Sequence, residues 1–382
     1  MFLKTLPIYL VFLLMGVADA IGPLSSQVEE NPFMAAWMPF FVFIAFAVFS
    51  VPGGVLAARI GKKNLLLLGL GLCVVATAVP CFMNPPFAML LASIFLLGVG
   101  TTFLQVAGNP IMRDVCPEGT YSRSLAMAQG IKGMGSTGSA YLVTAITFIA
   151  FFEVMEWRAA FPVFFTLMAL TFIAVSMLKV NEAKAEVPPS IGDSLALLKN
   201  PTFALAVLGI FLYVGAEVCM ATFLKPTLEF HGFEEKDAAL FGPSLFFGTI
   251  AIGRLIAGAL KVSAKTFFKI SAFLGITSLL LMLCAGILEM GQLVIPAVII
   301  GGLGFANIWP MLFSITVEER PERASELSGL MCMAISGGAV VPLAMGWLGG
   351  GDVAIAFVVP VVCFAYLLLL SFKRGKTVTS NA

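Results

Sequence analysis

Hydrophobic residues run in long, continuous blocks along almost the whole chain, and polar positions are confined to short breaks between these blocks. A block of about 20 apolar residues is long enough for one α-helix to cross a hydrocarbon core of about 30 Å. The blocks do not alternate between apolar and polar positions, so they predict transmembrane helices rather than barrel strands. Twelve spans are expected, at 6–27, 33–58, 64–83, 86–112, 122–151, 158–178, 201–228, 238–260, 266–287, 291–316, 325–348 and 353–372.

The composition agrees with a protein embedded in a lipid bilayer. Of the 382 residues, 60% are hydrophobic and 11% are charged, whereas soluble domains carry about 25% charged residues. The first span lacks an A-x-A-like cleavage site, so we expect it to remain as a helix. The predicted class is an all-α membrane protein with twelve transmembrane helices.

The charges between the spans predict an orientation. With the N-terminus inside the cell, the segments on the cytoplasmic side hold 18 of the 22 Lys and Arg residues. Cytoplasmic loops of membrane proteins carry such an excess. We therefore expect both termini to be cytoplasmic, in a multi-pass protein of a bacterial inner membrane.

The chain also divides into two similar halves. A polar stretch at 179–201 leaves six spans on either side. The short loop with Pro117 and Glu118 recurs as Pro321 and Glu322, about 200 residues later, which indicates an internal repeat. The predicted organisation is an N-terminal six-helix bundle at 1–179, a cytoplasmic linker at 180–200 and a C-terminal six-helix bundle at 201–382.

Two pseudo-symmetric six-helix halves with a central cytoplasmic loop resemble the major facilitator superfamily. In that fold the substrate site lies near the bilayer midplane between the halves. The stretch GGVLAARIGKK at 53–63 looks like the superfamily's loop motif between spans 2 and 3, with Ala58 where an acidic residue is usual. The resemblance implies a gating role for Arg59 and Gly61, and for Arg254 in the related stretch GRLIAGALKVSAK at 253–265.

Other stretches resemble the fucose–galactose–glucose:cation symporter family. They are FLYVGAEVCMATFL at 211–224, AGNPIMRDVCPEGTYSRSLAMAQ at 107–129, and parts of 306–346. Asp19, four residues before Pro23, matches an aspartate of that family. Two positions depart from it, because a proton-coupled member has an acidic residue at the place of Gln105 and a neutral polar residue at the place of Lys132.

Two charged residues are predicted near the midplane. Asp19 is ten residues from Glu29 at the outer mouth, and Lys132 is nine residues from Arg123 at the inner face; these separations are about 15 and 14 Å along a helix. Intramembrane charges face a cavity or a partner, so Asp19 and Lys132 are expected to pair and to take part in cation coupling. A purely structural ion pair is the alternative.

Four further residues are candidates for sugar binding. The amides of Gln105, Gln129 and Asn307 can donate to and accept from hydroxyl groups, and Trp309 offers a ring on which a pyranose can stack. Helix packing is the alternative role for these residues. Lys132, three residues after Gln129 on one helix face, is a candidate substrate ligand as well.

Glu217 is a third intramembrane charge. Within its own span, Lys225 is the only basic residue near it, two helical turns away. We expect Glu217 to bind the coupling cation, to bind the substrate or to carry a proton.

The expected function is cation-coupled uptake of a neutral hexose, such as glucose, galactose or fucose, by alternating access. One alternative is a transporter of a sugar acid or other organic anion whose carboxylate is bound by Lys132, and another is a hexose uniporter. His231 is the only histidine, which excludes a histidine-based zinc site, and no G-x-x-x-x-G-K-[ST] motif occurs, which argues against ATP drive. No enzyme activity, metal, nucleic acid or cofactor other than a coupling proton or Na⁺ is expected, and the protein is expected to act as a monomer.

Overall fold

The computed structural model describes residues 2–21, 24, 28, 34, 37–145, 155–180, 182, 189–350 and 353–375, and helices are its regular elements over these ranges. In the first half of the chain the elements are α1 (Phe2–Met15), the 3₁₀ helix η1 (Gly16–Ala20), α4 (Trp37–Ile60), α5 (Lys62–Phe82), α6 (Phe87–Val115), α7 (Tyr121–Ala145), η3 (Glu156–Ala160) and α9 (Phe161–Met177). The linker forms α10 (Ile191–Ala196) and η4 (Leu197–Lys199).

The second half follows the same plan with more interruptions. Its elements are α11 (Pro201–Phe230), α12 (Glu235–Ala239), the π-helix η5 (Leu240–Ser244), α13 (Leu245–Ala259), α14 (Ala264–Ile287), η6 (Gly291–Leu293), α15 (Val294–Ala306), α16 (Ile308–Glu319), η7 (Pro321–Arg323), α17 (Ala324–Met333), η8 (Ala334–Ser336), α18 (Gly337–Gly349), α19 (Val353–Ala356) and α20 (Val358–Gly375).

These helices confirm the predicted fold class. Within the described ranges, nine helical stretches are long and apolar enough to cross a membrane, and the apolar helices at Thr5–Ala18 and Val358–Lys373 are shorter. The 25-residue helix α7 covers residues 122–145 of the remaining predicted span, 122–151, whose last residues lie outside the described ranges. A helix therefore occupies the position of every predicted span.

The helices form two compact units. Unit 1 comprises Met1–Tyr121, Ile131–Leu197 and Arg320–Met333, and unit 2 comprises Ser122–Gly130, Leu198–Glu319 and Ala334–Ala382. The boundary near residue 197 falls inside the predicted linker. Each unit also contains a short segment that belongs to the other half of the sequence, namely 320–333 in unit 1 and 122–130 in unit 2.

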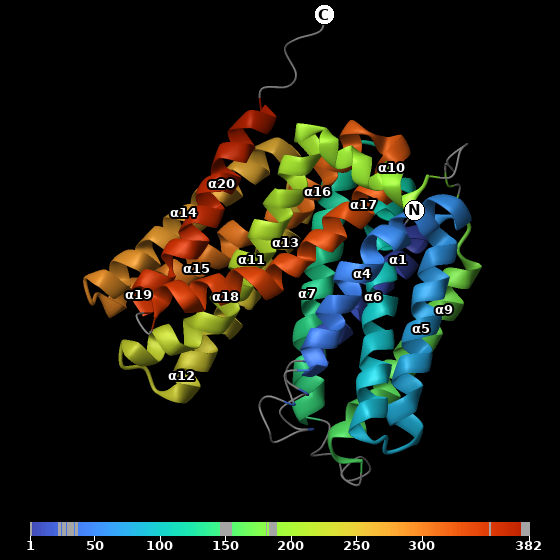
Figure 1. Cartoon of the computed structure of the whole chain (residues 1–382), viewed down its shortest axis with the longest axis horizontal. Helices are drawn as coiled ribbons and strands as arrows, with labels where there is room; N and C mark the ends of the chain where they lie inside the picture. Colours follow the sequence, from blue (N-terminus) through green and yellow to red (C-terminus); the bar gives the residue numbers. More distant parts are fainter. Residues whose placement is uncertain are drawn as a thin grey trace, which may run out of the picture. The chain divides into compact units, whose positions relative to one another are not determined.

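In unit 1, α6 packs against α4 and α5, α5 packs against α9, and α17 packs against α4 (Figure 1). Glycine permits close approaches between these helices. A Cβ atom on Gly54 of α4 would lie 2.7 Å from the carbonyl oxygen of Ser325 and 3.2 Å from the Cα of Gly329, both on α17. Small residues let transmembrane helices come this near to each other.

In unit 2, α11 packs against α18, α15 packs against α13 and α14, and α20 packs against α14 (Figure 1). An aromatic cluster fills the space between three of these helices. The ring of Phe305 lies 5.2 Å from that of Phe246 and 4.2 Å from that of Phe364, measured between centroids. Offset and edge-on aromatic pairs of this kind are favourable in a core.

Several spans are interrupted in the middle. The helical stretch Gly291–Glu319 breaks at Asn307, whose φ of −110° and ψ of 4° separate α15 from α16. The 3₁₀ helices η1 and η8 interrupt the first and eleventh spans. Such breaks free backbone groups from helical hydrogen bonding, and in a membrane this is tolerated where the backbone is enclosed by protein or lines a cavity.

Candidate functional site

The polar centre of unit 2 is Arg254. The residue is only 9% exposed, and its side chain makes four hydrogen bonds. Nε donates to the carbonyl oxygen of Ala306 at 3.0 Å, and Nη1 donates to that of Gln129 at 3.5 Å. Nη2 donates to the hydroxyl of Tyr213 at 3.3 Å and to Oε1 of Glu217 at 3.4 Å.

Arg254 does not lie in the loop after its span, and its gating role stays a prediction. Arg254 is buried inside α13, which continues to Ala259, because the apolar pattern of this span extends past the arginine. A signal for this was present in the sequence, since position 254 lies inside its own predicted span, 238–260.

Arg254 is also the partner that sequence reasoning missed for Glu217. The two side chains form an ion pair, and the hydroxyl of Tyr213 donates to the same carboxylate oxygen at 3.0 Å. Tyr213 and Glu217 are four residues apart on α11 and therefore share a helix face. The charge of Glu217 is thus balanced by a residue 37 positions later in the chain.

Asn307 and Trp309 are buried around the break in the tenth span, with exposed fractions of 4% and 5%. The Asn307 Nδ2 donates to the carbonyl oxygen of Gly253 at 3.1 Å. Within the described part of the chain, Asn307 Oδ1 and Trp309 Nε1 have no hydrogen-bond partner. A buried polar atom without a partner costs about 1–3 kcal/mol, so this acceptor and this donor are suited to a ligand.

The remaining predicted ligands lie in unit 1. Gln105 is buried on α6, and Lys132 is half-buried on α7. The side chain of Asp19 lies outside the described residues, so its ion pair with Lys132 stays a prediction. Among the carboxylates that are described, none lies within ion-pair distance of Lys132.

The backbone places Lys132 close to the first span, as expected for a partner of Asp19. A Cβ atom on Gly16 of η1 would lie 2.7 Å from the carbonyl oxygen of Lys132. The hydroxyl of Ser139 on α7 donates to the carbonyl oxygen of Gly16 at 3.2 Å. The first and fifth spans are therefore in contact three residues before Asp19.

The predicted gating loop forms a capped turn between α4 and α5. Gly61 has a φ of +96°, a conformation that favours glycine. The Glu182 carboxylate accepts hydrogen bonds from the backbone N–H groups of Lys62 and Lys63 at the start of α5, at 2.5 and 2.8 Å. A carboxylate at a helix N-terminus is favourable because it meets unpaired N–H groups and the positive end of the dipole.

Charged and polar contacts also tie this turn to neighbouring segments. Lys62 forms an ion pair with Asp114 at the end of α6. Arg59, exposed in the last turn of α4, donates to the carbonyl oxygen of Pro189 at 3.2 Å. The linker is therefore attached to the turn at Pro189 and Glu182.

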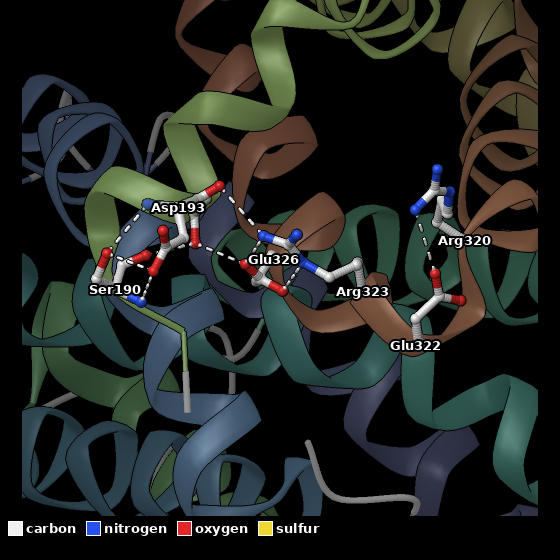
Figure 2. A network of polar contacts seen from close by, with 7 residues as sticks. Ser190, Asp193, Arg320, Glu322, Arg323 and Glu326 are labelled. Carbon is white, nitrogen blue, oxygen red and sulfur yellow. Dashed lines mark hydrogen bonds and ion pairs between the residues drawn. The ribbon is translucent and has the colours of Figure 1, made fainter. Parts of the chain in front are cut away.

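The linker helix α10 also contacts the start of α17 (Figure 2). Arg323 donates to both carboxylate oxygens of Glu326 at 2.5 Å and to the carbonyl oxygen of Asp193 at 3.1 Å. The hydroxyl of Ser194 donates to Glu326 Oε1 at 3.2 Å. Ser190 forms a capping box with Asp193 at the start of α10. We call Ser190, Asp193, Ser194, Arg323 and Glu326 the linker clasp.

Hydrogen bonds within the clasp lower the pKa of Asp193. The side chain and the backbone N–H of Ser190 donate to its carboxylate, and with the nearby charge of Arg323 they lower the pKa of Asp193 below its ordinary value of 3.8. The charged form of Asp193 is therefore favoured at neutral pH.

Comparisons with known proteins agree with this geometry. Residues 7–343 match the Major Facilitator Superfamily. The chain is 28% identical to a glucose/galactose transporter of Brucella abortus, over 94% of this chain and 89% of that protein. It is 20% identical to the L-fucose-proton symporter of Escherichia coli, over 97% of this chain and 92% of that protein.

The fold is also that of solved transporters. The structure of the Major Facilitator Superfamily transporter FucP in the outward conformation superposes with a TM-score of 0.82, covering 97% of this chain and 98% of that one, at 18% sequence identity. The matched family region, residues 7–343, covers most of the predicted spans, and the matched fold is that of transporters and not of enzymes. The chain is therefore a multi-pass membrane protein that belongs to the Major Facilitator Superfamily.

Proposed function

We propose that this protein takes up a neutral hexose by alternating access, coupled to a proton or a sodium ion. The observation that carries the proposal is the pair of buried, unpartnered polar atoms at the break in the tenth span, Asn307 Oδ1 and Trp309 Nε1. One is an acceptor and the other is a donor. A sugar hydroxyl both donates and accepts, so a polyol satisfies both atoms.

The names of the relatives support a sugar as the substrate. Proteins called glucose/galactose transporter and L-fucose-proton symporter match over most of their length. In this proposal Gln105 and Gln129 provide further amide contacts, and the ring of Trp309 supports one face of the sugar. Trp309 stacks on Phe313 with ring centroids 6.0 Å apart, which holds its indole in place.

The coupling cation is assigned to the carboxylates in the spans. Asp19 takes the proton or sodium ion in competition with Lys132, because an ammonium group nearby favours the charged, unoccupied carboxylate. Glu217 is a second candidate, and a cation there must replace Arg254 as its partner. The protein functions in the bacterial inner membrane as a monomer with both termini in the cytoplasm.

A sugar acid is the second candidate substrate. It is favoured by Lys132, which has no ion-pair partner among the described carboxylates and is only half-buried. Lys132 would bind the carboxylate of the substrate and Asp19 would then orient the ammonium group. If Lys132 itself takes the place of the coupling ion, the protein is a hexose uniporter.

Counterflow in proteoliposomes tests these proposals. The purified protein is reconstituted and loaded with unlabelled glucose, galactose, fucose or glucuronate, and entry of the labelled compound is measured. Exchange of a hexose that glucuronate does not inhibit supports the hexose proposal. Exchange of glucuronate alone replaces it with the sugar-acid transporter, and no exchange of any of the four contradicts both.

The same vesicles test coupling. Accumulation of the hexose against its gradient is measured with an imposed pH gradient, with a sodium gradient and with neither. Accumulation driven by one gradient identifies the cation. Equilibration without accumulation under all three conditions contradicts symport and supports the uniporter.

A further inference from the structure

Arg254 and the residue before it contact both residues whose side-chain amides unit 2 contributes to the proposed sugar site, Gln129 through its backbone and Asn307 through its amide. The guanidinium donates to the backbone carbonyl of Gln129, and the carbonyl of Gly253 accepts from the side chain of Asn307. Gln129 comes from α7 and Asn307 from the break between α15 and α16. One short segment of α13 thus holds backbone and side-chain groups from two other spans.

The hydrogen bond from Arg254 to the carbonyl of Ala306 replaces one that the helix itself cannot form. In an α-helix the carbonyl of residue 306 would accept from the N–H of residue 310. Residue 310 is a proline and has no N–H. The regular pattern resumes one residue later, where the N–H of Met311 donates to the carbonyl of Asn307 at 3.1 Å. Arg254 Nε supplies the donor that the sequence of the tenth span lacks.

The remaining contacts fix the direction of the guanidinium. Glu217 and Tyr213 both accept from Nη2, which turns Nε and Nη1 toward Ala306 and Gln129. A guanidinium presents its donors in a rigid planar fork, whereas a lysine ammonium is a compact charge on a flexible stem. The arrangement therefore depends on arginine and is not reproduced by positive charge alone.

We infer that Arg254 is a positioning residue for substrate binding. It satisfies the Ala306 carbonyl that Pro310 leaves unpaired and so fixes the break that presents Asn307 Oδ1 and Trp309 Nε1. It also holds the backbone of Gln129 against α13. The inference rests on the proposed function, because the substrate it positions is the proposed hexose.

The first test is Arg254→Lys. This variant keeps a positive charge opposite Glu217 and loses the fork that reaches Ala306 and Gln129. We expect the dissociation constant for the transported hexose, measured by isothermal titration, to rise about tenfold or more, as for other lost buried hydrogen bonds. The matched control is Arg123→Lys on α7, which loses a single bond to the carbonyl of Ala259 on α13 and should bind with the parental affinity.

A purely structural role predicts a different result. In that case Arg254→Lys lowers the melting temperature and leaves hexose affinity unchanged, which overturns the inference. If Arg254→Lys does not fold, the double variant Glu217→Gln/Arg254→Gln replaces it. Removing both charges avoids leaving one buried and unpaired. Parental affinity in this folded double variant also overturns the inference.

A readout without substrate separates this inference from the proposed function. Hydrogen exchange of the peptide around 306–312 should be faster in Arg254→Lys than in the parent, because the carbonyl of Ala306 loses its donor and the break loosens. Unchanged exchange contradicts the positioning role even if the parent transports hexoses. Failure of counterflow in the parent contradicts the proposed function, whatever the exchange rates are.

Discussion

The most informative side chains are those whose polar atoms are buried without a partner. Trp309 is one of them, and its ring is already held by stacking on Phe313. Its Nε1–H can therefore be removed with little change in packing. A substitution of Asn307 would also break a second bond, because its Nδ2 donates to the carbonyl oxygen of Gly253.

Trp309→Phe should weaken hexose binding about tenfold or more, since the substrate hydroxyl loses its donor while most of the apolar contact is kept. Its melting temperature should fall only modestly, because the smaller ring leaves part of a buried volume empty, while the lost indole N–H bonds to no described residue. The measurement is titration of the hexose, with Trp347→Phe as control. Trp347 is 84% exposed on α18 and is not in the proposed site. Parental affinity in Trp309→Phe would remove this donor from the site.

Lys132 distinguishes the two candidate substrates. If it binds a carboxylate, Lys132→Ala should lose inhibition by glucuronate and keep hexose uptake. If it pairs with Asp19, Lys132→Ala should change the pH or sodium dependence of uptake, because Asp19 loses a nearby cation. Uptake against pH, with and without sodium, is compared for Lys132→Ala, Asp19→Asn and the double variant. A parental profile in both single variants contradicts any functional role of the pair.

Among the helices, α4 and α17 pack closely because glycines, which have no side chain, lie where they meet. Gly54 lies against Ser325 and Gly329, and a Cβ atom on Gly329 would in turn lie 2.7 Å from the carbonyl oxygen of Ser50. Backbone atoms cannot move aside as a flexible side chain can. A methyl group at either glycine must therefore separate the two helices.

Gly54→Ala should destabilise the protein by about 1–3 kcal/mol, the usual range for overpacking a tight core. Gly71→Ala on α5 is the matched control, because its Cβ would meet only Phe172, at an ordinary 3.9 Å. Alanine is favoured over glycine within a helix by about 0.5–1 kcal/mol, so this control should be neutral or slightly stabilised. Thermal unfolding in detergent measures both, and equal melting temperatures would contradict the close packing of α4 on α17.

For the whole molecule, the segments 122–130 and 320–333 show where the two sequence halves are joined. Each packs in the unit formed mainly by the other half, and the linker clasp adds polar contacts between α10 and α17. A transporter that alternates access must form and break the contacts between its halves. We therefore expect the clasp to stabilise one of the alternating conformations.

Arg323→Gln should shift the protein away from that conformation. Glu326 is only 4% exposed and would lose the cation that neutralises it. Labelling of the buried thiol of Cys332 on α17, followed by mass spectrometry, should become faster. Arg320→Gln is the control. Arg320 pairs with Glu322 (Figure 2), both side chains are exposed, and exposed ion pairs contribute little to stability. Equal labelling of Cys332 in the two variants would contradict a role for the clasp.

The clasp should also depend little on pH in the physiological range. Because the pKa of Asp193 is lowered, the stabilisation by its charged form is fully present above the ordinary value of 3.8. It is lost only as the pH falls through the lowered pKa. The ratio of the Cys332 labelling rates in Arg323→Gln and in the parent, which cancels the pH dependence of the thiol itself, should therefore stay constant between pH 5 and pH 8, a range above that ordinary value.

The local order of residues was sufficient to predict the spans; the repeat and the candidate ligands inferred from it stay predictions. In lipid the backbone must satisfy its own hydrogen bonds, so an apolar run of sufficient length forms a helix wherever it occurs. Asn307 and Trp309 could be selected in the same way, because a polar residue in an apolar span is costly and therefore informative. Their place at a helix break follows from Pro310, which has no N–H to continue the pattern.

The pairing of residues across helices could not be obtained in this way. Glu217 and Arg254 are 37 positions apart on α11 and α13, and no periodicity relates two faces of different helices. The hydrophobic pattern also could not predict that segment 122–130 packs in unit 2 and segment 320–333 in unit 1. Either half offers these segments equally apolar neighbours. The free energy gained by burying apolar surface depends on the area removed from water and not on which neighbouring surface covers it. Partners and register were decided by the geometry of packing, through the close approach of glycines and the directed donors of one arginine.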